Sequence, residues 1–191
     1  MGNECHKIKL YSAQTKVVFD AIERDGVCYS KAEYVRRKYQ ESAPIFLTAY
    51  SWFVKEMPKY VEKPEEAEYP YWAFMDLYNV DSSDHVLELE VLADEAVYFD
   101  MMDWNKIMRL SYIGENEDDE KEFLENMRAC GLDWNKVMLT NFYPDWKQKI
   151  MKSWERLFRH HEKIKQGDRS GVHSVQAGLW RIKKEWMKEQ E

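Results

Sequence analysis

The sequence predicts a single α+β domain, residues 1–191, in which a small mixed or antiparallel sheet is flanked by several helices. Three observations support this prediction. A chain of 191 residues with 45% hydrophobic residues has the size of one domain and can bury a sizeable core. Hydrophobic and polar residues alternate near the N-terminus and again at residues 85–92, as they do in half-buried strands. Elsewhere the hydrophobic residues recur at the spacing of helices.

The N-terminal part begins with a strand and a helix. Residues 7–14, KIKLYSAQ, alternate as a strand does. A helix follows, with Thr15 as its expected N-cap and Gly26 as its expected C-terminal stop. Ser30 and Glu33 then form a capping-box pattern, which predicts a second helix.

A third helix and three strands complete the first half of the chain. The helix begins near Pro44 and has a broad apolar face. We expect a strand at residues 71–75, which are few and rich in β-forming residues. Residues 85–92, HVLELEVL, form the clearest strand, because the apolar residues face one side and the two glutamates face the other. A short strand is expected at residues 96–100.

The second half is mainly helical and contains an internal echo. DWNKIM at residues 103–108 recurs as DWNKVM at residues 133–138, and each aspartate is expected to cap a helix. Two copies are too few for a solenoid, so similar helix starts or a local duplication is the favoured interpretation. The longest predicted helix covers residues 144–166. Residues 172–186 begin with strand-like alternation and end with a helical pattern.

Composition and motifs argue against several functional classes. A net charge of −7 disfavours a surface dedicated to nucleic acid, although the basic run at residues 156–169 leaves a local contact open. The three cysteines fit no zinc or thioredoxin spacing, and the histidines have no ligand spacing. We therefore predict no metal site and free thiols in a cytoplasmic protein. No apolar run is long enough for a membrane span, and P-loop, Rossmann and α/β-hydrolase motifs are absent.

Aromatic residues make up 15% of the chain and gather in two short segments, AYSWF at residues 49–53 and YPYWAF at residues 69–74. Such rings would form a stacking floor for a base or a nicotinamide. Ordinary core packing is the alternative, in which the indole N–H and phenol O–H groups need partners. The candidates for the floor are Tyr50, Trp52, Tyr71, Trp72 and Trp104.

Three polar side chains are candidates for ligand contacts. Glu88 and Glu90 lie on one side of their predicted strand, about 6.5–7 Å apart. In a cleft, either carboxylate would polarise a ribose hydroxyl or act as a base; a solvated strand face is the alternative. Gln14 ends the first strand, and its amide would bind a polar ligand or cap the start of the next helix. Asp100 is a further carboxylate candidate, or a cap or turn former.

Several segments, taken in order, resemble an uncharacterised bacterial and phage family, domain of unknown function 3841. The similarity covers most of the chain and is weakest over residues 105–145; it implies no particular reaction. The matching segments are LYSAQT…DGV (10–27), AYSWFVKEM (49–57), YPYWAF (69–74), VLELEV…D…W (86–104), SWERLF (153–158) and VQAGLWRI (175–182).

The order of the first strand, the helix ending in DG and the ring-rich segments is also similar to ADP-ribosyltransferase-type folds. Those proteins hold NAD with a residue on the first strand, an aromatic floor and a late glutamate. The resemblance implies these roles for Gln14, for Tyr50 or Trp72, and for Glu88 or Glu90. The chain departs from that pattern because its first strand has no arginine or histidine at the usual place.

Two functional hypotheses follow from these observations. In the first, the chain recognises a nucleotide such as NAD and has ADP-ribosyltransferase-like chemistry. In the second, it is a non-catalytic protein-interaction module, in phage–host conflict or in regulation, that binds a protein partner through an exposed aromatic face. The residues alone name neither an enzyme activity nor a cofactor, and NAD enters only through the ADP-ribosyltransferase resemblance.

Overall fold

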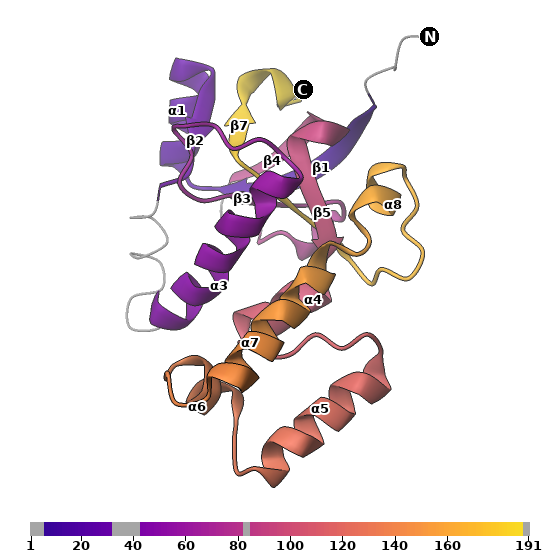
Figure 1. The fold of residues 1–191 in the computed structure, drawn as a ribbon. Coiled ribbons are helices and arrows are strands. Elements are labelled where there is room, and N and C mark those ends of the chain that lie inside the picture. The colour runs from indigo at the N-terminus through magenta and orange to yellow at the C-terminus, as the bar shows by residue number, and fades with distance from the viewer. Residues whose placement is uncertain (1–5, 32–42, 82–84, 189–191) are drawn as a thin grey trace.

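A five-stranded antiparallel sheet organises the fold, with helices on both of its faces (Figure 1). The computed structural model describes residues 6–31, 43–81 and 85–188. The predicted α+β class is confirmed, and the sheet is antiparallel throughout, with the strand order β4-β1-β3-β6-β5. The helix expected after the capping box at Ser30 and Glu33 lies outside the described residues.

The predicted strands have close counterparts in the structure, and two further short strands, β2 and β7, pair with each other. The described strands are β1 (Lys7–Gln14), β2 (Val27–Tyr29), β3 (Tyr71–Phe74), β4 (His85–Leu92), β5 (Ala96–Asp100), β6 (Val175–Leu179) and β7 (Arg181–Lys183). The described α-helices are α1 (Lys16–Asp25), α3 (Ala43–Glu56), α4 (Met101–Met108), α5 (Glu117–Ala129), α6 (Trp134–Met138), α7 (Pro144–Ser153) and α8 (His161–Lys165).

The register places one residue from each strand in a single row across the sheet. The row contains Glu88, Tyr11, Phe74, Gln176 and Phe99. Directly opposed residues of antiparallel strands point to the same face, so these five side chains define one side, which we call the α3 face. The opposite side is the α1 face. Glu88 therefore shares the α3 face with the aromatic residues of the central strands.

Each face of the sheet carries its own hydrophobic core. The core on the α3 face joins α3, α4 and the helices that follow, and it includes Phe53, Trp104 and Trp154. The core on the α1 face includes Leu10, Ile22 of α1 and Tyr98. Figure 1 shows α4 to α7 gathered at one end of the molecule, away from α1 and the β2–β7 pair. The α3 face thus receives the largest share of the rings.

Caps explain where several helices begin and end. Gly26 ends α1 in the left-handed conformation, with φ of 77°, as predicted. Thr15 occupies the N-cap position of α1, but its side chain makes no capping hydrogen bond. In α6 the side chain of Asp133 accepts from the backbone N–H of Lys136, which confirms the predicted cap. The expectation for Asp103 is wrong, because α4 begins earlier and is capped by Asp100.

The longest predicted helix, residues 144–166, is divided in the structure. Helix α7 ends at Ser153, residues Trp154–Phe158 form a 3-10 turn, and α8 follows after a short break. The turn buries Trp154, Leu157 and Phe158 together. The tighter 3-10 winding brings residues three apart to the same side, so tertiary packing overrides the regular helical period here.

Candidate functional site

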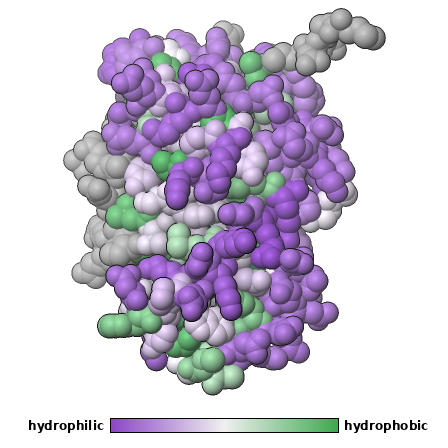
Figure 2. Space-filling view, viewed as in Figure 1, coloured by the Kyte–Doolittle hydropathy of each residue, from purple (hydrophilic) through white to green (hydrophobic). Residues whose placement is uncertain are grey.

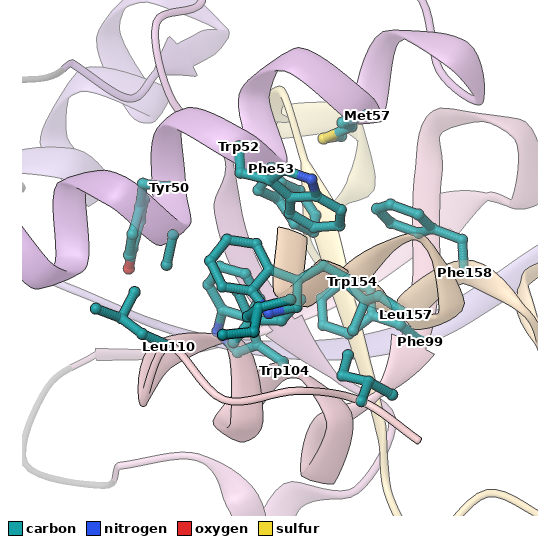
Figure 3. Packing of buried hydrophobic residues seen from close by; sticks show 14 of the residues in the cluster. Tyr50, Trp52, Phe53, Met57, Phe99, Trp104, Leu110, Trp154, Leu157 and Phe158 are labelled. Carbon is teal, nitrogen blue, oxygen red and sulfur yellow. The ribbon is translucent and has the colours of Figure 1, made fainter. Parts of the chain in front are cut away.

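Three of the predicted ring residues, Tyr50, Trp72 and Trp104, meet in the core beneath α3; Figure 3 shows Tyr50 and Trp104 there. The ring centroids of Trp72 and Trp104 are 4.8 Å apart, and that of Tyr50 lies 5.4 Å and 5.8 Å from them. The indole Nε1–H of Trp72 donates to the hydroxyl of Tyr50 over 2.7 Å. Tyr50 and Trp104 are each only 4% exposed. The three rings therefore pack against one another, and Tyr50 provides the partner that the indole of Trp72 needs, as in the core-packing alternative.

The other two predicted ring residues lie elsewhere in the two cores. Trp52 stacks on Phe158, with centroids 6.0 Å apart and an interplanar angle of 13°. Tyr71 belongs to the core on the α1 face, and its hydroxyl donates to the Cys28 sulfur over 3.1 Å. A ligand that used the five predicted rings as one floor would have to displace this packing. The two neighbouring rings of β3 instead join different cores: Trp72 packs on the α3 face and Tyr71 on the α1 face.

The predicted polar residues lie on β1 and β4. The carboxylate of Glu88 contacts the ammonium groups of Lys9 at 2.8 Å and Lys188 at 3.1 Å. These hydrogen bonds hold the pKa of Glu88 below its usual range. Glu90 is half-buried on the same face of β4. The amide of Gln14 donates to the hydroxyl of Ser12 over 2.8 Å, so it is tied to its own strand.

A large open groove adjoins Glu88 at the outer edge of the sheet, beside β4. Its volume is about 1720 Å³, and we call it the edge groove. Its walls include Tyr11 and Glu88 from the sheet, Phe19 of α1, Tyr29 of β2, and Arg181 and Lys183 of β7. Glu90 is not part of its lining. The structure thus separates the two predicted glutamates, because Glu88 lines the edge groove and Glu90 does not.

The C-terminal segment builds one wall of the edge groove. After β6 the chain continues into β7, which pairs with β2. It then returns to the sheet, where Met187 bridges Leu89 and the backbone N–H of Lys188 donates to the carbonyl of Glu88 over 3.0 Å. Residues from the N-terminal and the C-terminal parts of the chain are therefore fixed around the edge groove.

The charges along the edge groove are balanced. Arg181 and Lys183 both contact Glu95, at 2.9 Å and 2.6 Å, and Lys184 contacts Glu23 at 2.6 Å. Burial alone would raise the pKa of Glu95, but the hydrogen bonds from Lys183 and Arg181 lower it. The lining itself has four cations and four carboxylates beside two tyrosines: Arg181, Lys183, Lys184, Lys188, Glu23, Asp25, Glu88 and Glu185, with Tyr11 and Tyr29. This lining can bind a ligand that carries a ring, hydroxyl groups and negative charge.

A carboxylate–imidazole pair lies outside the edge groove and was missed by the sequence analysis. Oδ2 of Asp100 accepts from the backbone N–H of His173 over 2.9 Å and lies 3.0 Å from its Nδ1. Burial alone would raise the pKa of Asp100, but hydrogen bonds from the backbone of His173 and Met102 lower it. The His173 side chain is 80% exposed. A fixed carboxylate that orients an imidazole is an arrangement suited to proton transfer.

Within the described ranges the structure contains neither a metal-ligand cluster nor a helix that could span a membrane. In residues 6–31, 43–81 and 85–188, no three His, Cys, Asp or Glu side chains are placed to share a metal ion. Among the helices of those same ranges, none combines the length and apolar character needed to cross a bilayer.

The comparisons identify a family. A family model described as "Domain of unknown function (DUF3841)" matches residues 9–188, so the chain belongs to that family. This confirms the resemblance carried by the ordered segments. No curated protein and no solved structure matches the chain significantly. The family description names no activity, so the similarity to ADP-ribosyltransferases, the cytoplasmic location and the bacterial or phage origin stay predictions.

Proposed function

We propose that the chain recognises a nucleotide of the NAD class in the edge groove. The observation that carries the proposal is the position of Glu88, whose carboxylate lines a groove flanked by Tyr11, Tyr29 and several cations. A glutamate suits the ribose hydroxyls, a tyrosine ring suits a flat base, and Arg181 suits a phosphate. The ring contact assigned to Tyr50 and Trp72 from the sequence would pass to the two groove tyrosines.

The chemistry that fits this arrangement is ADP-ribosyl transfer. In that reaction the bond between ribose C1′ and the nicotinamide nitrogen breaks, and nicotinamide leaves with the bonding electrons. A nucleophile of the acceptor then bonds to C1′ and gives up a proton. Glu88 would hold a ribose hydroxyl and stabilise the positive charge that develops on the sugar. Its present partners, Lys9 and Lys188, keep it ionised, which is the form this role requires.

A pair of variants on the same strand tests the proposal. Binding to the folded state raises the melting temperature by an amount that grows with ligand concentration, so NAD should raise that of the wild type in a concentration-dependent manner. Glu88→Gln should remove most of this shift and any release of nicotinamide. Glu90→Gln is the matched control, because it makes the same change two residues away on the same face but outside the groove lining. It should retain both properties.

Two results would contradict the proposal. If NAD, AMP and other nucleotides all leave the melting temperature of the wild type unchanged, the groove is not a nucleotide site. If Glu90→Gln loses the shift as completely as Glu88→Gln, the effect is general to the strand. Both variants should melt near the wild type without ligand, because exposed ion pairs add little stability.

A second candidate function, a protein-interaction module, is favoured by exposed apolar residues near α6. Leu139 is 47% exposed and Phe142 is 82% exposed, and both lie between α6 and α7. Figure 2 shows hydrophobic atoms at the lower end of the molecule, where Figure 1 places α6. A partner that binds there should be lost with Phe142→Asp and kept with Tyr78→Asp, which alters an exposed ring elsewhere. Equal loss with both would argue against this surface.

A further inference from the structure

A second hollow, remote from the edge groove in the sequence, is lined mainly by cations. It has a volume of about 620 Å³ and lies beside α7 and the 3-10 turn that follows it. We call it the basic hollow. Its lining has four cationic side chains and a single carboxylate, although the whole chain has a net charge of −7. The lining consists of Lys149, Lys152, Arg156, Arg159, Glu155, Ser153, Tyr112 and Phe123.

The two arginines of the basic hollow are held in place by backbone carbonyls. Nη1 of Arg156 donates to the carbonyl of Ile113 over 2.9 Å, and Nη1 of Arg159 donates to that of Gly114 over 3.3 Å. Each arginine also contacts one carboxylate, Glu115 and Asp103 respectively. A guanidinium has five N–H donors, so each retains donors for a ligand. Their fixed planes are preorganised for the oxygens of an anion.

The two lysines of the basic hollow carry positive charge that the described residues do not neutralise. Lys149 and Lys152 are exposed on α7, and neither is within ion-pair distance of a carboxylate in the described parts of the chain. The ammonium of Lys149 lies 5.5 Å from the ring centroid of Trp146. Two such cations beside two fixed guanidinium groups attract negative charge to the hollow.

Aromatic rings form the back of the basic hollow. Tyr112 and Phe123 stack with centroids 3.9 Å apart and an interplanar angle of 4°, and Trp134 lies parallel to Phe123. Arg156 lies over the ring of Tyr112, 5.7 Å from its centroid. Because these ring faces already have neighbours, they form an apolar wall that strengthens nearby charge interactions. They do not offer a free platform for a base, so an anionic group is the part of a ligand that this site would recognise.

We propose that the basic hollow binds the polyphosphate tail of a small ligand. Lys149 and Arg156 are seven residues apart along α7 and the 3-10 turn, which is roughly 10–12 Å. A single phosphate has all its oxygens around one phosphorus, so two or more linked phosphates are needed to reach cations spread over this length. The volume is in the range of small-molecule sites. This site is independent of Glu88 and of the nucleotide proposal for the edge groove.

Inorganic tripolyphosphate without metal is the direct probe, measured by calorimetric titration of the full chain. The wild type should bind it, orthophosphate should bind more weakly, and added salt should weaken both. Lys149→Gln combined with Lys152→Gln should lower the affinity about tenfold or more, since two charge-assisted contacts are lost. Both lysines are exposed, so the fold should be unaffected. Glu88→Gln should leave the binding unchanged.

A control with the same change in charge gives the measurement its specificity. Lys55→Gln combined with Lys163→Gln removes two exposed lysines outside the hollow and should leave the affinity within about twofold of the wild type. The proposal is overturned if the wild type does not bind tripolyphosphate, or if both double variants weaken binding equally. It is also overturned if an oligonucleotide binds more tightly than tripolyphosphate and gains affinity with length, because the partner would then be a nucleic-acid strand.

Discussion

Gly178 gives the aromatic core room to approach the sheet, and the change Gly178→Ala tests this packing. Gly178 lies on β6 between Trp72 and Val97 of the neighbouring strands. A Cβ atom added there would lie 3.0 Å from Cζ and 3.1 Å from Cε1 of Phe53, and 3.2 Å from a methyl group of Val97. These distances are shorter than ordinary van der Waals contacts, so a neighbour has to move.

The surroundings of Phe53 decide the size of the effect. Its ring is fully buried, and its centroid is 4.9 Å from that of Trp72, 5.2 Å from Trp104 and 5.5 Å from Phe99. Overpacking of such a core costs about 1–3 kcal/mol. Replacing glycine also restricts the unfolded chain, which stabilises the folded state by about 0.4–1 kcal/mol. We expect a net destabilisation of about 1–2 kcal/mol, or a melting temperature lower by about 2–8 °C for a chain of this size.

A double-mutant cycle with Phe53→Leu provides the assay. Urea unfolding followed by tryptophan fluorescence would give the free energy of unfolding for the wild type, each single variant and the pair. Leucine lacks the two ring atoms that meet the added methyl group, so Gly178→Ala should cost much less in the Phe53→Leu background. The packing argument is refuted if Gly178→Ala is neutral or stabilising, or if its cost is the same in both backgrounds.

Two further predictions concern buried polar groups. His161 is 3% exposed and its Nδ1 accepts from the backbone N–H of Tyr98; burial lowers its pKa despite the nearby carboxylate of Glu162. Because the unfolded state binds the proton more readily, stability should be full above about pH 6.5 and fall as the pH drops toward the folded pKa. Urea midpoints between pH 8 and pH 5 would show this slope, and His161→Gln should reduce it. Asp100→Ala removes the cap of α4 and should cost about 1–2 kcal/mol in urea unfolding, whereas His173→Ala keeps the cap and should cost less; equal losses would contradict the assigned role of Asp100.

Local patterns predicted the elements of the fold well where one physical cause dominates. The strand at residues 85–92 alternates strictly because one of its faces is buried and the other half-exposed, and β4 has those bounds. Gly26 marks the end of α1 because a left-handed residue is needed there. The long helix at residues 144–166 was divided because the burial of Trp154 and its neighbours outweighs helical periodicity. The cap of α4 was misplaced because two aspartates, Asp100 and Asp103, compete for the position, and local sequence does not rank them.

Side-chain partners were harder to predict than elements. The sequence indicated that rings gather, and Tyr50, Trp72 and Trp104 do meet. It did not show that their faces are covered, since ring packing and ligand stacking need the same residue types. The pairing of Asp100 with His173 was also missed, because 73 residues separate them and neither belongs to a known motif. Such contacts depend on strand order, which periodicity does not determine.

The edge groove shows why the site could be predicted only in part. Glu88 was identified from its strand, but the wall opposite it comes from residues 181–188, which reach β4 only because β6 continues into β7 and the chain then turns back. Lys188 holds Glu88 twice, through a backbone hydrogen bond and through an ion pair. The edge groove therefore forms only when residues 187–188 pair with the edge of β4. A ligand that contacts both Glu88 and the wall formed by residues 181–188 would also stabilise the contact between the C-terminal segment and β4. Such a ligand binds only while the two walls are together, so it shifts the equilibrium toward that arrangement.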